Sequence, residues 1–488
     1  MNGKDELLKI VGSENFFDAA DILEKLACDH SFVNPIKPLY VIKPKTSDQV
    51  QSIVKWANQT NTPLVPISSG TPHFHGDTVP STGGAVIVDL SSMKQIVRID
   101  RRNRVALVEP GVTFAELQPA LEKEQLRLNI PLLPRLSKSV VGSMLEREPV
   151  TMPKYHWDIA DPMLCTEVIF GSGDLFRTGS AAGPGTLAEQ WALGSAQEIP
   201  MGPGQVDWYR MIQGAQGTMG IVTWATIRCE RAPRLEQPFL VGSSNLNKLS
   251  ELMHWLIRLR LVDQCMVLNR FNLATILARE QPNDFETLRD SLPAYMLFFC
   301  IAGYEYSPEE RIEWQKAEIM ELAKRIGVKP RKQIHHVSAI EMLKILRLPS
   351  EEPYWKLRPK GSCYDIFFLT MYDKLPELIE SMFTLAVKYS YPVRDIGIYL
   401  QPIVQGTSCH CEFNLFFDRE NETEVDRVRK LSLDAVPNLM SKGAFFSRPY
   451  GFWADIAYRR DAETTAVLRK MKGIFDPNNI LNPGKLCF

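Results

Sequence analysis

The chain has 488 residues, of which 45% are hydrophobic and 23% charged, and its formal net charge is −1. These values are typical of a soluble globular protein of two or three domains, and they exclude a polybasic surface for nucleic acid or anionic membrane. No apolar run approaches the roughly 18 residues that a transmembrane helix needs. The nine scattered cysteines argue against a disulfide framework, and the acidic N-terminus lacks the apolar core of a signal peptide. We therefore expect a cytoplasmic protein.

The beginning of the chain alternates short strands with amphipathic helices. Residues 1–36 carry apolar side chains at helical spacing, and the run 38–44 predicts a short strand between two prolines. Thr46, with Gln49 three positions later, resembles a helix N-terminal capping box. The apolar periodicity that follows predicts an amphipathic helix to about Asn58.

A loop of small and polar residues comes next, between two apolar runs at 63–67 and 85–90. Gly70 and Gly76 let its backbone approach a ligand where a Cβ would collide. Backbone N–H groups that converge from such a loop form a concavity that suits an anion, typically a phosphate. The loop is therefore the first candidate binding segment.

The chain continues with strands predicted at 95–99 and 105–108, and Thr113 with Glu116 forms a second capping box that starts a helix. Residues 129–164 then contain many prolines in non-periodic order. A long irregular stretch inside a compact domain is usually functional. The alternation of strands and helices predicts a mixed domain.

A hairpin is predicted over 165–178, around the turn at 171–174. Residues 179–205 are rich in Gly and Pro and are expected to form an exposed insertion, and 219–228 is the last predicted strand of this unit. Near Pro233 the pattern changes. Strands then alternate with long helices, which predicts a second α+β domain; the strands are 265–269, 296–302, 365–371 and 397–404.

Four stretches, in chain order, carry a resemblance to a known family: 66–90, 108–113, 214–223 and 476–485. They resemble the flavin-binding segments of the vanillyl-alcohol oxidase / para-cresol methylhydroxylase superfamily of FAD-dependent oxidoreductases. No G-x-G-x-x-G run opens a helix after a strand, so a Rossmann dinucleotide unit is not expected. The resemblance instead implies an α+β protein with a PCMH-type FAD-binding domain.

The resemblance also implies a division of the chain. Residues 1–235 form the FAD-binding domain, residues 236–443 form an α+β cap domain that lays the substrate against the flavin, and residues 444–488 return to the FAD domain. The residues assigned to the flavin are Ser68, Ser69, Gly70, Thr71, His73, Val141, Gly142, Ser143, Thr151, Ile221, Val222, Asn482 and Lys485. A lysine near the flavin stabilises the negative charge that develops at its N1/C2=O edge.

Some members of the superfamily attach the flavin covalently. One subgroup uses a His after S-G-G in the first loop, where this chain has Thr71, with His73 two residues further on. Another attaches the flavin from the second domain, where Tyr364 and His410 are candidates. The threonine at the first position favours non-covalent FAD.

The substrate side departs from the phenol-oxidising members of the family. Those enzymes hold a phenolate with two tyrosines and an arginine and place an aspartate near flavin N5. The corresponding positions are expected to carry His75, Phe452, Trp453 and Tyr155, which removes the permanent charge of the phenolate clamp. His75 is a candidate general base, because an imidazole titrates near working pH, and Tyr155 is a candidate for orienting the substrate.

The strand 409–417 places three polar side chains, His410, Glu412 and Asn414, on one face, which indicates a pocket wall. A metal held by His410 and Glu412 is an alternative, but the Gly-rich, His-bracketed motif of metal-binding 2-hydroxy-acid dehydrogenases is absent, so we predict no metal. Arg448 is a candidate clamp for a substrate carboxylate.

The predicted function is removal of a hydride from an activated C–H of an alcohol or hydroxy acid to flavin N5, by a dehydrogenase rather than an oxidase. The chain has no iron–sulfur cysteine cluster, so one-electron transfer onward requires an electron-acceptor protein, with oxygen as the other acceptor. Two alternatives stay open, oxidation of an alkylphenol-type aromatic and a non-catalytic or electron-relay subunit of a larger complex. A homo-oligomer is compatible with either.

Overall fold

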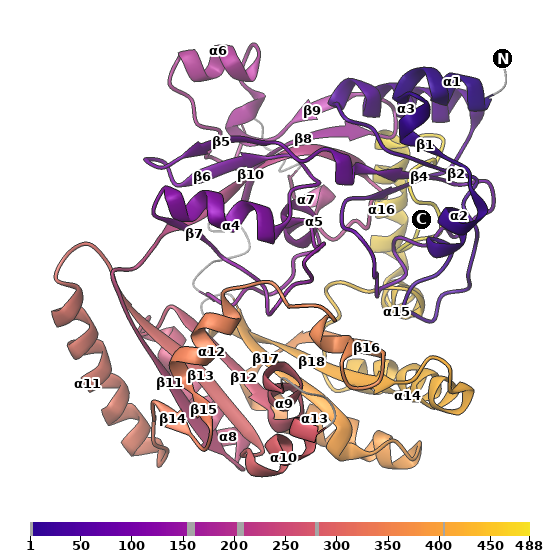
Figure 1. Ribbon diagram of the computed structural model, residues 1–488. Helices are drawn as coiled ribbons and strands as arrows, with labels where there is room; N and C mark the ends of the chain where they lie inside the picture. The colour runs from indigo at the N-terminus through magenta and orange to yellow at the C-terminus, as the bar shows by residue number, and fades with distance from the viewer. Residues whose placement is uncertain (1–2, 154–161, 203–208, 279–282, 404–405) are drawn as a thin grey trace.

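The structure is a computed structural model that describes residues 3–153, 162–202, 209–278, 283–403 and 406–488. Two bodies lie one above the other in Figure 1. The upper one contains two sheets from the N-terminal half together with the C-terminal tail, and the lower one contains a third sheet of six strands. Mixed helix and strand content in both bodies confirms the predicted α+β class.

The first sheet has four strands and a parallel core. Helix α3 (Ser47–Thr60) connects β2 to β3, and both strands pair with β4 in parallel, while β1 pairs with β2 antiparallel. Helix α1 (Gly3–Val11) packs on α3 in a shared apolar core, and α2 (Ala20–Lys25) follows β1. The strand order is β1 (Phe16–Phe17), β2 (Tyr40–Ile42), β4 (Val86–Asp89) and β3 (Leu64–Ile67).

The second sheet is antiparallel and built around the long strand β10 (Gly220–Arg231). Its other strands are β5 (Ile96–Asp100), β6 (Val105–Val108), β7 (Leu126–Leu128), β8 (Met163–Phe170) and β9 (Leu175–Arg177). The helices of this part are α4 (Phe114–Lys123), α5 (Val140–Leu145), α6 (Leu187–Ala192) and α7 (Tyr209–Ile212).

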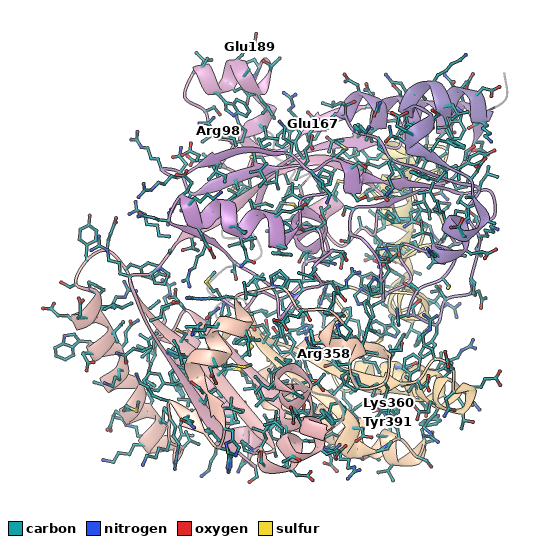
Figure 2. All side chains as sticks on the ribbon, in the orientation of Figure 1. Arg98, Glu167, Glu189, Arg358, Lys360 and Tyr391 are labelled. Carbon is teal, nitrogen blue, oxygen red and sulfur yellow. The ribbon has the colours of Figure 1, made fainter. Side chains whose placement is uncertain are left out.

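Glu167 of β8, labelled in Figure 2, joins these two sheets. Its carboxylate accepts hydrogen bonds from Ser47 at the start of α3 (2.8 Å), from Thr223 of β10 (2.8 Å) and from Arg177 of β9 (3.0 Å). Because a buried carboxylate is costly unless it is fully hydrogen-bonded, these three donors fix α3 over the second sheet.

The third sheet has six strands and is covered on both faces. Alternate residues point to opposite faces, so Cys265 and Val267 enter one apolar core while Met266 and Leu268 enter the other. The strand order is β11 (Leu235–Ser243), β13 (Tyr295–Gly303), β12 (Gln264–Asn269), β17 (Ile396–Ile403), β18 (Ser408–Phe417) and β16 (Ser362–Thr370).

Different helices cover the two faces. The first core contains residues of α8 (Leu246–Arg258), α11 (Pro308–Ile326), α13 (Leu375–Lys388) and α14 (Glu422–Ser441). The second contains residues of α9 (Arg270–Leu277), α10 (Asn283–Ser291) and α12 (Ala339–Leu346). A short hairpin, β14 (Gln333–Ile334) and β15 (Val337–Ser338), precedes α12.

The C-terminal tail returns to the first sheet. After α15 (Phe452–Tyr458) and α16 (Ala462–Phe475), Leu481 forms a parallel bridge with Leu64 at the start of β3. Figure 1 shows α16, in yellow, beside the indigo N-terminal elements. This return brings the last predicted binding segment next to the first one.

The structure forms only one of the two predicted helix capping boxes in full. Thr113 and Glu116 form the reciprocal capping box that the sequence predicts. Thr46 accepts from the Gln49 backbone, but the Gln49 side chain accepts from Lys45 instead of from Thr46. The expected exposed insertion at 179–205 contains α6, which caps itself with a box of its own.

The nine cysteines of the chain all carry free thiols. Within the described parts of the chain, no helix combines the length and the apolar character that crossing a bilayer requires.

Lys472 of α16 holds the returning tail in place. Its buried ammonium donates to the carbonyls of Thr218 (2.6 Å) and Leu481 (3.0 Å) and pairs with Asp476. Asp476 in turn accepts from the backbone N–H groups of Ile480 and Leu481. One buried ion pair therefore orders the turn that precedes residue 482.

Replacing this lysine is expected to destabilise the fold. Lys472→Met leaves the Asp476 carboxylate buried without its cation, so the free energy of unfolding should fall by about 3 kcal/mol. Urea denaturation followed by circular dichroism measures the change, with Lys470→Met on the exposed side of the same helix as control. Equal stability of the two variants would contradict this role.

Candidate active site

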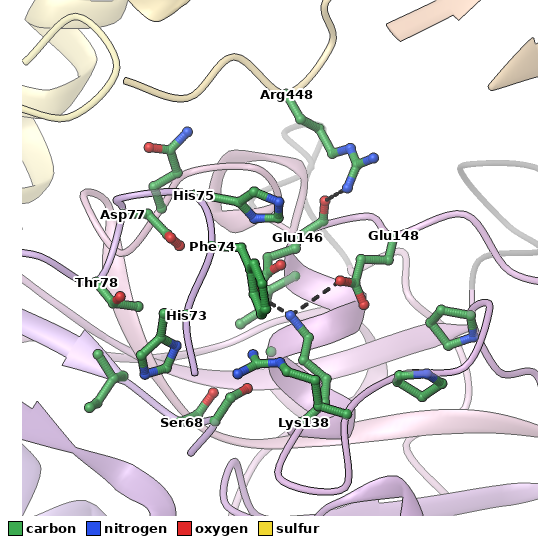
Figure 3. A pocket seen from close by; sticks show the side chains of 18 of the residues that line it. Ser68, His73, Phe74, His75, Asp77, Thr78, Lys138, Glu146, Glu148 and Arg448 are labelled. Atoms are coloured by element: carbon green, nitrogen blue, oxygen red, sulfur yellow. Dashed lines mark hydrogen bonds and ion pairs between the residues drawn. The ribbon is translucent and has the colours of Figure 1, made fainter. Parts of the chain in front are cut away.

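One cavity lies where loops of the upper body face the third sheet. Its walls come from four parts of the chain: the loop 66–78, the irregular stretch 131–149, the segment 212–222, and cap residues that include Tyr354, Lys356, Asp365, Phe367, Tyr399 and Glu412. Arg448 and Tyr450, which follow the cap in sequence, complete the lining. Figure 3 shows part of this lining, with residues of the loops and Arg448 labelled.

The loops pack so closely that glycine is required at their contacts. A Cβ on Gly142 would lie 2.8 Å from Ser68 Oγ, and one on Gly217, where φ is +72°, would lie 2.5 Å from Pro66 Cγ. The Ser69 hydroxyl accepts from the backbone N–H of Ser139 (3.0 Å). Loop 66–78 is therefore locked against both other loops of the upper body.

The tail closes this arrangement. The Asn482 side-chain amide donates to the carbonyls of Asp77 (2.8 Å) and Gln216 (2.7 Å), and Lys485 Nζ donates to the carbonyl of Gly76 (2.7 Å). Residues from both ends of the chain thus meet, as the resemblance implied. Asn482 and Lys485 do not line the cavity, and their side chains hold the loops that do.

The residues predicted to bind flavin fall into two groups. Those that line the cavity are Ser68, Ser69, His73, Val141, Gly142, Ile221 and Val222. The others lie behind the wall: the Ser143 hydroxyl donates to Glu148, Thr151 donates to the Ile130 carbonyl (3.0 Å), and Gly70 and Thr71 offer backbone carbonyls to Ser137. Tyr155, predicted to orient substrate, lies outside the described residues.

The lining fits a flavin nucleotide. Small side chains and glycines of three loops form one wall, and the buried Nε2 of His73, which lies on that wall, has no hydrogen-bond partner among the described residues. Unpaired buried polar atoms are costly unless a ligand or water satisfies them. A polar, multi-atom group at this wall removes that cost.

His75, a residue of loop 66–78, lines the cavity between the loops and the cap. Its ring stacks on Tyr450, with centroids 4.6 Å apart, and meets Phe367 edge-on at 5.5 Å. Burial and the nearby cations of Lys138 and Arg448 hold the pKa of His75 well below its usual value. The imidazole is therefore neutral at pH 7.

A buried ion cluster borders His75 on the loop side. Lys138 Nζ lies 2.7 Å from Glu146 and 3.3 Å from Glu148, as the dashed lines in Figure 3 show. Arg448 donates to the Glu146 carbonyl (3.2 Å) and lies over the Phe367 ring, with 4.4 Å between guanidinium and centroid. The Arg448 side chain is buried but has only this neutral hydrogen-bond partner among the described residues.

A second ion cluster forms the cap side. Lys356 Nζ donates to Asp365 and to Glu412, both at 2.6 Å, and His410 Nε2 lies 3.2 Å from the other Glu412 oxygen. Asn414 donates to both carboxylates (2.6 and 2.7 Å). His410, Glu412 and Asn414 do share one face, but the candidate catalytic His410 lies behind Glu412 and does not reach the cavity lining.

Sequence reasoning missed Lys356 and Asp365, because neither is close to Glu412 in sequence. Glu412 gives one oxygen to Lys356, and its other oxygen lies beside His410. Within the described ranges, no three His, Cys, Asp or Glu side chains are grouped as metal ligands. Lys138, Glu146 and Glu148 were also not predicted, although they lie in the irregular stretch flagged as functional.

The expected positions of the phenolate clamp need correction. Phe452 and Trp453 do not line the cavity; helix α15 begins at Phe452 and turns the Trp453 ring into the cap core, against Tyr364 and Phe367. Tyr364, a candidate for covalent attachment, is part of the same core.

The raised pKa of the buried Asp77 carboxyl makes the stability of the protein depend on pH. Burial, with added repulsion from Glu146 and Asp29, raises the pKa of Asp77 from 3.8 to about 7. The folded protein therefore retains a proton that the unfolded chain loses near pH 4, so this group makes stability decrease as pH rises from about 4 to about 7.

In flavin-free protein, Asp77→Asn is expected to remove the decrease in stability between about pH 4 and about pH 7. Each unit by which the pKa differs between the folded and unfolded states corresponds to about 1.4 kcal/mol of unfolding free energy at neutral pH. Urea unfolding at a series of pH values measures it, with exposed Asp21→Asn as the control. If both variants keep the parent's pH slope, Asp77 is not the group responsible.

Comparisons with known proteins agree with this geometry. Residues 38–179 match the model of an FAD binding domain, and residues 372–486 match the C-terminal domain of FAD linked oxidases. A glycolate oxidase subunit of Bacillus subtilis is 22% identical over 99% of this chain and 96% of its own. A D-2-hydroxyglutarate dehydrogenase of Stutzerimonas stutzeri is 23% identical over 99% and 98%.

Solved structures show the same fold. The p-cresol methylhydroxylase structure superposes with a TM-score of 0.84 at 19% identity, covering 100% of this chain and 96% of the other. The 4-ethylphenol oxidase of Gulosibacter chungangensis gives 0.82 at 19% identity, over 99% and 96%. The chain therefore belongs to the FAD-linked oxidoreductases of the vanillyl-alcohol oxidase / para-cresol methylhydroxylase superfamily, and its cofactor is FAD.

Proposed function

We propose that the protein oxidises an alcohol or a hydroxy acid at an activated C–H bond. FAD, when bound, supplies the hydride acceptor. The substrate binds between the loop wall and the cap, and the electrons leave to an acceptor protein, with oxygen as the alternative acceptor. In this proposal residues 1–235 and 444–488 hold the cofactor, and residues 236–443 close the site.

The environment of His75 is the observation that carries the proposal. A neutral imidazole faces the cavity, and its ring orientation is fixed by Tyr450 on one side and Phe367 on the other. A base in this position takes the hydroxyl proton of the substrate as the C–H bond gives up its hydride. Burial keeps the imidazole unprotonated beforehand, so the base is ready when substrate arrives.

Arg448 favours a hydroxy acid over a simple alcohol. Its buried guanidinium spends one N–H on a neutral carbonyl, so further donors remain for a carboxylate, which a guanidinium binds in a bidentate manner. Three relatives carry the name of a hydroxy-acid oxidase or dehydrogenase: the two above, and a D-lactate dehydrogenase of Arabidopsis thaliana that is 28% identical over 40% of this chain and 31% of its own.

An alkylphenol is the second candidate substrate class. Arg448 and Tyr450 both line the cavity, and an arginine with tyrosines is the set that holds a phenolate in the phenol-oxidising members. The flavoprotein subunit of a 4-cresol dehydrogenase of Pseudomonas putida is 32% identical over 162 residues, about a third of this chain. Both substrate classes use the same base and the same arginine.

The first test is the loss of the base. His75→Asn removes the proton acceptor, so the rate of anaerobic flavin bleaching by 2-hydroxy acids should fall about 100-fold or more, while the flavin content stays at the parent's level. Stopped-flow absorbance of the holoenzyme measures the rate, with exposed His336→Asn as the matched control.

Bleaching by alkylphenols alone would select the second substrate class. If no alcohol, hydroxy acid or alkylphenol bleaches the flavin of the parent protein, the proposed oxidation is wrong. That result would favour an electron-relay subunit. An undiminished rate in His75→Asn would remove this residue from the chemistry.

We further propose that FAD is held without a covalent bond. Thr71 has no ring nitrogen to form one, and His410 and Tyr364 lie away from the cavity lining. His73 and His75 are the histidines of loop 66–78 that line the cavity, and His73 is the one beside the position that carries the covalent bond in one subgroup. Acid precipitation of purified protein should therefore leave the yellow flavin in the supernatant. A yellow pellet would contradict this, and His73→Ala would then show whether His73 is the point of attachment.

A further inference from the structure

Arg135 is a buried cation that forms no ion pair with any side chain that the structure describes. It is 7% exposed, it lines the cavity, and its guanidinium lies 5.7 Å from the Phe74 ring centroid. One N–H donates to the carbonyl of Gly70 (2.8 Å). In the part of the chain that the structure describes, no carboxylate lies within ion-pair distance of it. Burying a guanidinium without a counter-charge is costly, so a ligand anion is expected here.

The position of Arg135 indicates which anion. The arginine begins a short segment that runs along the small-residue loop: Ser137 bonds to the carbonyls of Gly70 and Thr71, and the Ser139 N–H donates to the Ser69 hydroxyl. That loop is the one whose converging backbone suits a phosphate. Arg135 is therefore attached directly to the predicted phosphate loop.

The other cations of the lining already have partners or lie elsewhere. Lys138 is neutralised by two glutamates, and Lys356 by Asp365 and Glu412. Arg448 also lacks a carboxylate, but it is bonded to the Glu146 carbonyl and covers the Phe367 ring of the cap. Among the described lining residues, Arg135 alone combines an uncompensated charge with a bond to loop 68–71.

We propose that Arg135 is the counter-charge for the diphosphate of FAD, and that it acts together with Ser68 and Ser69, the residues of that loop that line the cavity. A diphosphate carries two negative charges and presents oxygens that a guanidinium binds in a bidentate manner. The inference rests on FAD as the cofactor and is independent of which substrate is oxidised. It assigns recognition of the phosphates to a side chain as well as to main-chain amides.

The test compares FAD with riboflavin, which has the same ring system and no phosphate. Flavin-free protein is titrated with each ligand, and the quenching of flavin fluorescence gives the two dissociation constants. Arg135→Met should raise the dissociation constant for FAD tenfold or more and leave that for riboflavin within twofold. Arg135→Lys, which keeps a charge without the planar fork, should give an intermediate value for FAD.

Arg448→Met is the matched control, since it removes the other uncompensated guanidinium of the cavity and should leave the dissociation constant for FAD unchanged. Thermal unfolding checks that each variant folds, and Arg135→Gln replaces Arg135→Met if the latter does not. FAD binding as tight as in the parent would overturn the proposal. Equal losses for FAD and riboflavin would also overturn it, because they would indicate packing of the loop. Flavin binding is measured without substrate, so these outcomes are separate from any failure of the proposed oxidation.

Discussion

The side-chain amide of Asn482 is the interaction on which the rest of the site depends. Its two N–H groups reach the Asp77 carbonyl in the first loop and the Gln216 carbonyl in the third. Segments from the beginning, the middle and the end of the chain thereby share one hydrogen-bonding group. Because such an amide is buried, losing either partner would leave an unpaired donor, so the loops keep a single arrangement. The ion pair of Lys472 with Asp476 orders the turn that precedes Asn482, and this turn positions the Asn482 side chain.

The cavity built on this arrangement is lined by charges that largely neutralise one another. Lys138 lies between two glutamates on the loop side, and Lys356 lies between two carboxylates on the cap side. His75 faces the cavity between these clusters and is kept neutral by burial and by the neighbouring cations. Among the described residues, two guanidinium groups of the lining have no carboxylate partner: Arg135 beside loop 68–71, and Arg448 over the Phe367 ring.

Local signals predicted much of the fold because they depend on neighbours in sequence. The box of Thr113 and Glu116 closes within one helical turn, and the period-two pattern of β18 placed His410, Glu412 and Asn414 on one face. The same reasoning could not say that His410 lies behind Glu412, since that depends on the strands and the segment that cover it. Nor could it find Lys356, whose two partners lie 9 and 56 positions away.

The sequence by itself indicated FAD through the family resemblance of four ordered motifs, and it predicted the small-residue loops, because both depend on short runs of consecutive residues. The tertiary structure alone decided which side chains face the cavity. It turned Trp453 into the cap core, brought Arg448 and Tyr450 to the lining, and left Arg135 without an ion-pair partner among the described residues. Such outcomes follow from long-range packing and from the cost of buried charge, and both depend on contacts between segments that lie far apart in the chain.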